Sequence, residues 1–192
     1  FYKTIKNKKT IIYKHYLFIE IMNFNETLKK VQSSEIFKKF EVEHPKAEIC
    51  AGFFILDFLS NDNKDSIDYK EDEKIFTFNI INDEIKMYED KLMTLPNAPK
   101  LQNIIPKVKI DIEELKSIAQ EKAHEEGISS KFNKIIAVLQ KHEDQKTKEN
   151  IQVWNLTCML DQLIILHVII NSDTGEIIKF QRKSFMDMIK TK

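Results

Sequence analysis

A run of apolar residues that ends in a turn sequence is the feature that most constrains the fold. Residues 163–170, LIILHVII, lead directly into NSDTG at 171–175, and apolar residues return at 177–180. The run is far too short to span a bilayer, and its β-branched residues favour a strand. Asn171 or Asp173 can hydrogen-bond the backbone of the turn, and Gly175 can adopt positive φ at no steric cost. The sequence therefore predicts two antiparallel strands joined by this turn.

The first half of the chain predicts one helix followed by strands. Apolar residues recur at helical spacing over residues 25–43, and Pro45 ends that stretch. SNDNKDS at 60–66 predicts a turn, because its residues are those that turns favour. β-branched and aromatic residues predict strands over residues 49–60, 67–70 and 73–81.

The middle of the chain predicts a connector and then a second helix. Residues 84–106 are expected to be partly helical at EIKMYEDKLM and are then broken by three prolines. Asp111 is a good N-cap, Glu114 is its capping-box partner, and Gly127 suits the end of the helix. The expected buried stripe is Ile112, Leu115, Ala119 and Ala123. The strands expected next are 133–141, 151–160, 163–170 and 176–183, followed by a short amphipathic C-terminal helix from residue 184.

The order of elements in the first half returns in the second half. This pattern predicts an α+β fold made of two repeats, each a helix plus an antiparallel meander, with curled sheets packed on helices. The two halves could pack as neighbours or share one sheet. The expected divisions are an N-terminal extension outside the core at 1–21, a first repeat with its connector at 22–106, and a second repeat at 107–192.

Composition limits the partners and the compartment. Thirty basic residues balance thirty acidic residues, so no overall field attracts nucleic acid or an anionic membrane, and neither is expected as a partner. Cys50 and Cys158 are far apart and fit no zinc spacing, so they are expected to be small core residues. The apolar residues 10–22 are interrupted by charges and lack a cleavage site, so we expect a cytoplasmic protein. We expect it to be a monomer or a homodimer.

Residues 109–180 resemble a PepSY domain. The matching segments are the helix DIEELKSIAQEKA, the strand around VWNLTCM with Trp154, and HVIINSDTGEII, where PepSY sequences often end in a variant of IDxxTGEV. Asn171 stands where that family commonly has Asp. The first half looks like a more diverged copy, so the chain is similar to a tandem PepSY-like or cystatin-like protein. The resemblance implies a non-enzymatic interaction or inhibitory module, which would bind a protein or peptide through a sheet face or an edge strand.

Candidate active-site residues are few. Cys158, Asp161 and His167 lie close in sequence, but Cys158 shares a strand face with Trp154 and Leu156, which favours a buried thiol. His167 either lies on an open sheet face, where it would contribute to binding, or is a core histidine bonded to a carbonyl, which we expect. No nucleotide-binding or hydrolase motif is present, so we predict no catalytic residue, no metal ligand and no cofactor.

The phenylalanines allow a second function. Phe53, Phe58, Phe76 and Phe78 belong to two aromatic-rich segments, and a core that covers both faces of a sheet would explain them. The alternative is an apolar concavity beneath the curved sheet, lined by these four residues, that would hold a small hydrophobic ligand or a partner helix. That alternative describes a ligand-binding protein or an enzyme.

Overall fold

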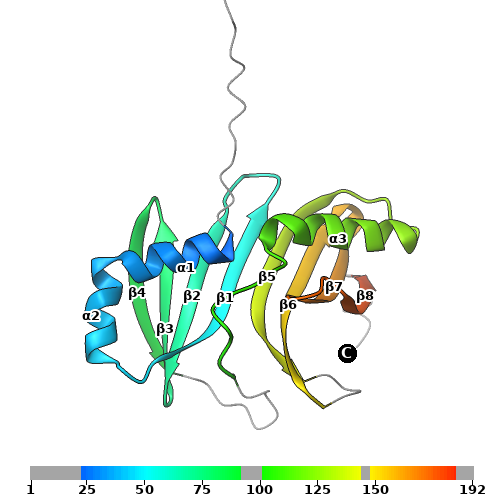
Figure 1. Cartoon of the computed structure of the whole chain (residues 1–192). Coiled ribbons are helices and arrows are strands. Elements are labelled where there is room, and N and C mark those ends of the chain that lie inside the picture. Colours follow the sequence, from blue (N-terminus) through cyan, green and yellow to red (C-terminus); the bar gives the residue numbers. More distant parts are fainter. Residues whose placement is uncertain (1–22, 92–100, 144–147, 185–192) are drawn as a thin grey trace, which may run out of the picture.

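Over the described residues the fold is α+β, with eight strands in one antiparallel sheet and three α-helices over one of its faces (Figure 1). The computed structural model describes residues 23–91, 101–143 and 148–184. The helices are α1 (Phe24–Ser33), α2 (Glu35–Glu43) and α3 (Ile112–Glu125). The strands are β1 (Glu48–Asp57), β2 (Lys64–Glu71), β3 (Lys74–Ile81), β4 (Glu84–Lys91), β5 (Phe132–Glu143), β6 (Asn150–Leu160), β7 (Ile164–Asn171) and β8 (Ile177–Ser184).

The strand order is β4-β3-β2-β1-β5-β6-β7-β8. The two meanders therefore share one sheet, joined where β1 pairs antiparallel with β5 from Gly52–Leu139 to Asp57–Lys134. In Figure 1, α1 and α2 lie over β1–β4, and α3 lies over β5–β8. A single hydrophobic cluster contains residues from all three helices and from both meanders. One core thus spans the boundary that the sequence placed near residue 107.

Three aromatic residues pack at the seam between the two meanders. Phe24 of α1, Phe54 of β1 and Trp154 of β6 are at most 2% exposed. Their ring centroids lie 5.8–6.4 Å apart in edge-on arrangements, which aromatic pairs favour. The Trp154 indole N–H donates to the carbonyl oxygen of Ile110 at 2.8 Å, so burial leaves its polar atom paired.

The predicted single helix over residues 25–43 is wrong, because Ser34 divides it. Ser34 is extended, with φ −75° and ψ 150°, and it is both the C-cap of α1 and the N-cap of α2. Its Oγ donates to the carbonyl oxygen of Val31 and accepts from the N–H of Phe37. Serine competes with the helix for backbone partners in this way, and a propensity sum over the whole segment misses it.

The second helix matches its prediction. The Asp111 carboxylate accepts from the N–H of Ile112, and the Asp111 N–H donates to Glu114, as in a capping box. The expected stripe of Ile112, Leu115, Ala119 and Ala123 is buried, and Gly127 has φ +73°. Asp111 also accepts from the Phe24 N–H and the Asn25 side chain, which brings the N-termini of α1 and α3 together.

The predicted helical part of the connector is also wrong, since β4 occupies most of it. Asn82 and Asp83 both have positive φ, 50° and 65°, and form a two-residue turn between Ile81 and Glu84. Asn and Asp tolerate this backbone region, and a turn of this kind continues the meander. Pairing with β3 therefore overrides the helix-favouring composition of EIKMYEDKLM.

The predicted turn at 60–66 is displaced towards the N-terminus. Residues 64–66 already belong to β2, and the chain turns just after Asp57. The Asp57 carboxylate accepts from the N–H groups of Leu59 and Ser60 and pairs with Lys134 at 2.9 Å. These hydrogen bonds, the one from the Ser60 N–H foremost, hold the pKa of Asp57 well below its usual range. The predicted N-terminal extension and C-terminal helix lie outside the described residues.

We expect Trp154→Ala to lower the free energy of unfolding by about 3–5 kcal/mol, because it removes a fully buried ring from the seam. Urea denaturation followed by circular dichroism measures the loss. The chain has a single tryptophan, so the wild-type emission should be blue-shifted and insensitive to iodide. An emission that iodide quenches readily would contradict the packing of this residue.

Candidate functional site

The described helices leave the opposite face of the sheet uncovered (Figure 1). Alternate residues of each strand point to it, and paired positions form rows across β1, β5, β6, β7 and β8. We call these three rows the open face. They are Phe53, Val138, Asn155, Ile169 and Lys179; Ile55, Ile136, Thr157, His167 and Gln181; and Asp57, Lys134, Met159, Ile165 and Lys183.

The open face is apolar at its centre and basic at its β8 end. Ile136, Val138 and Ile165 are half-buried, and Met159 is 37% exposed. Asp57 is the only acidic residue in the three rows, and it is buried against Lys134. Lys179 and Lys183 are exposed, and among the described residues neither has an acidic partner. The surface therefore combines uncovered apolar area with uncompensated positive charge.

His167 lies on this open face, so the expectation of a core histidine is wrong. Its neighbours Leu166 and Val168 are fully buried on the helix side, whereas His167 is half-buried and pairs across the sheet with Thr157 and Gln181. Its Nε2 lies 2.7 Å from Oδ1 of Asn155. The alternation of β7 places it there, because its sequence neighbours supply the core.

Burial lowers the pKa of His167, and the positive charges of Lys179, Lys183 and His142 act in the same direction. The imidazole is therefore neutral at pH 7. In this state its ring N–H can donate to Asn155. His167 and Asn155 thus form a polar pair within the apolar centre of the open face.

We expect a histidine NMR titration to give His167 a midpoint below the ordinary value of about 6.5. His167 then binds a proton less readily in the folded state than in the unfolded state. The free energy of unfolding therefore falls as the pH drops below the pKa of His167 in the unfolded state, and it levels off below the pKa in the folded state. His167→Gln should flatten that part of the stability profile while keeping a donor for Asn155. An unchanged profile in this variant would contradict the assignment.

The four phenylalanines do not line one cavity. Phe76 and Phe78 have no exposed surface and pack on Phe40 of α2, with ring centroids 4.9 and 5.0 Å away. Phe53 lies on the open face, and Phe58 lies past the end of β1, where the Lys116 ammonium is 3.8 Å from its ring centroid. Phe76 and Phe78 therefore belong to the core. Phe53 lies on the opposite side of the sheet.

The imagined cysteine site is not assembled. Cys158 is fully buried on the helix side, His167 is on the open face, and Asp161 accepts a hydrogen bond from Asn133. Burial raises the pKa of Cys158 to about 12, so its thiol is protonated at neutral pH. Cys50 is also fully buried, as predicted, and burial raises its pKa to about 12. Within the described residues, no three His, Cys, Asp or Glu side chains gather as metal ligands.

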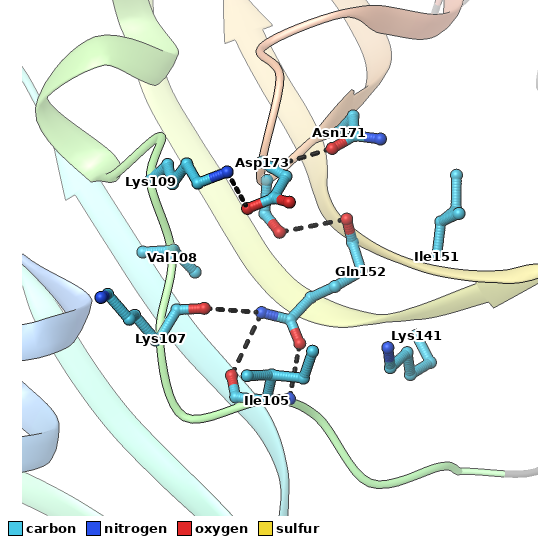
Figure 2. A pocket seen from close by; sticks show the side chains of 10 residues that line it. Ile105, Lys107, Val108, Lys109, Lys141, Ile151, Gln152, Asn171 and Asp173 are labelled. Atoms are coloured by element: carbon cyan, nitrogen blue, oxygen red, sulfur yellow. Dashed lines mark hydrogen bonds and ion pairs between the residues drawn. The ribbon is translucent and has the colours of Figure 1, made fainter.

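A pocket of about 340 Å³ lies beside the NSDTG turn, between the connector and the ends of β5 and β6 (Figure 2). Gln152 occupies its floor, where its side chain donates to the carbonyl oxygens of Ile105 and Lys107 and accepts from the Ile105 N–H. Lys109 pairs with Asp173 at 3.4 Å, but both side chains are mostly exposed, so the pair is weak. The side chain of Gln152 therefore forms its hydrogen bonds with the connector.

The turn has the local geometry that the sequence predicts. Asn171 Oδ1 accepts from the N–H groups of Asp173 and Thr174, and Gly175 has φ +75°. The carbonyl oxygen of Ser172 accepts from the N–H groups of Lys109 and Ile110. The turn therefore holds Lys109 and Ile110 of the connector in place just before α3 begins. The sequence does not predict this contact.

We expect Gly175→Val to lower the free energy of unfolding by about 1–3 kcal/mol, because a β-branched residue fits this positive φ badly. Asn171→Ala should lower it by about 1–2 kcal/mol through the two lost hydrogen bonds. Urea denaturation measures both. Asp173→Ala is the matched control and should change little, because its side chain is exposed. Full stability of Gly175→Val would contradict the turn geometry.

Comparisons with known proteins bear on the fold alone. Neither the models of protein families nor the curated proteins give a match to this chain. Among solved structures, the fold is similar to that of a protein described as a "putative lipoprotein" from Clostridium difficile 630, with a TM-score of 0.52. The sequence identity is 11%, and the match covers 78% of this chain and 91% of that chain. Among the described helices, none combines the length and the apolar character needed to cross a membrane.

Proposed function

We propose that this protein is a non-enzymatic interaction module that binds a protein partner on the open face. One observation carries the proposal. The open face joins half-buried Ile136, Val138 and Ile165 to Lys179 and Lys183, which have no acidic partner within the described part of the chain, and no described helix covers it (Figure 1). An uncovered apolar area with charge at its margin is typical of an interaction surface.

The proposal includes the resemblance to tandem PepSY-like or cystatin-like repeats. Two helices precede the four-stranded meander of the first half, and one helix precedes that of the second half, an order that supports such a duplication. Modules of this kind act by surface complementarity and need no catalytic residues. An inhibitory role would follow if the bound partner is an enzyme whose active site this face occludes.

The alternative of a ligand pocket beneath the sheet has less support. It requires Phe53, Phe58, Phe76 and Phe78 around one concavity, whereas Phe76 and Phe78 pack against Phe40 with no exposed surface. A buried thiol at Cys158 with a raised pKa also offers no activated nucleophile. These observations favour the outer face of the sheet over a pocket.

We expect affinity capture with the wild-type protein to enrich a partner that the variant Ile136→Lys, Ile165→Lys does not enrich. Two lysines in the apolar centre would add charges that the partner must desolvate. The matched control is Tyr88→Lys on β4, which is 50% exposed and distant from these rows. Circular dichroism should confirm that all the variants are folded. Equal capture by wild type and the open-face variant would reject this proposal.

A further inference from the structure

The strand β8 is an edge of the sheet with an unusual charge. It is the last strand in the order β4-β3-β2-β1-β5-β6-β7-β8, so among the described strands its outer backbone groups have no strand partner. Lys179, Arg182 and Lys183 of this strand are exposed, and the strand contains no acidic residue. An edge strand is a template for a further strand, and its side chains select which strand can pair with it.

The opposite edge of the sheet differs. β4 carries Glu84, Glu89 and Asp90 beside Lys86 and Lys91, so its charges nearly balance. The positive charge of β8 is therefore specific to one edge of a chain with no net charge. Pairing β8 with β8 of a second copy would bring cations together, and like charges opposite each other destabilise a strand pair. The charge of β8 is complementary to an acidic strand.

The two sides of β8 define what such a strand would contain. Lys179, Gln181 and Lys183 point to the open face, and Phe180 and Arg182 point to the helix side, where Phe180 packs against the core. Residues directly opposite in an antiparallel pair share a face. A complementary strand therefore has acidic residues opposite Lys179, Arg182 and Lys183 and an apolar residue opposite Phe180.

We propose that the partner contributes an acidic, extended peptide segment that adds to the β8 edge as a further antiparallel strand. This inference rests on the proposed function and names the chemistry of the partner at one margin of the open face. Backbone hydrogen bonds along β8 hold the segment, and the acids opposite Lys179, Arg182 and Lys183, with the apolar residue opposite Phe180, fix its register. Salt screens the attraction, because the cations are exposed.

The test uses a fluorescent peptide with Glu-Asp-Thr-Val-Glu at its centre, flanked by β-branched residues, and measures anisotropy against the full chain. We expect saturable binding that weakens as salt rises. Lys179→Glu, Lys183→Glu should weaken it at least about tenfold, because two attractive cross-strand pairs become repulsive. Lys86→Glu is the matched control, since Lys86 is an exposed lysine on the same face of the other edge strand, and it should leave binding unchanged.

A second peptide carries N-methyl groups on the alternate backbone amides that would face β8. It separates strand addition from simple charge attraction. We expect it to bind at least about tenfold more weakly, because it cannot donate those hydrogen bonds. Equal binding of both peptides would overturn the proposal, as would equal binding by the Lys179→Glu, Lys183→Glu variant.

Absence of peptide binding would also overturn the proposal. The lysines would then act only to prevent edge association. Self-association of the chain through β8, or binding of anionic vesicles in place of the peptide, would likewise count against it. The proposed function would still stand in each case if capture depends on Ile136 and Ile165, so the two failures are distinguishable.

Discussion

The antiparallel pairing of β1 with β5 is the constraint on which the rest of the structure depends. It joins two meanders into one sheet and places the helix faces of both over a single core. Phe24, Phe54 and Trp154 then meet across this seam, from a helix and from strands of both meanders. A meander of four strands has two edges of its own, but joining two meanders through β1 and β5 pairs the two inner edges and leaves only β4 and β8 as edges.

Asp111 fixes how the helices sit on this sheet. Its carboxylate accepts from the backbone of both α1 and α3, so one negative charge lies at the positive ends of two helices. The connector that leads to it is held by Gln152 of β6 and by Ser172 of the NSDTG turn. These contacts hold α1 and α3 on one side of the sheet, and the opposite side is left to Ile136, His167 and Lys179.

The candidate site results from the alternation of side chains along the strands, because every second side chain of a strand points to the core and the others point to the open face. His167 lies on the open face because its neighbours Leu166 and Val168 are buried in the core beneath α3. Lys179 lies on the same face because it pairs with Ile169 of β7. The aromatic content of the chain serves the core for the most part, as the packing of Phe76 and Phe78 on Phe40 shows. The proposed recognition surface is therefore the open face, with its apolar centre and its basic edge.

Local signals in the sequence determined the capped helix after Asp111, the strands from residue 132 onward and the NSDTG turn, because each depends on residues that are neighbours in the chain. Only the tertiary structure decided that Ser34 divides the first helix, that residues 84–91 form a strand, and which side of β7 faces outward. The division at Ser34 uses local hydrogen bonds that compete with an uninterrupted helix, whereas the other two outcomes depend on pairing and burial between distant segments, which can override local propensity. The open face is of this second kind, since its rows combine residues from β1 to β8 that no local pattern connects.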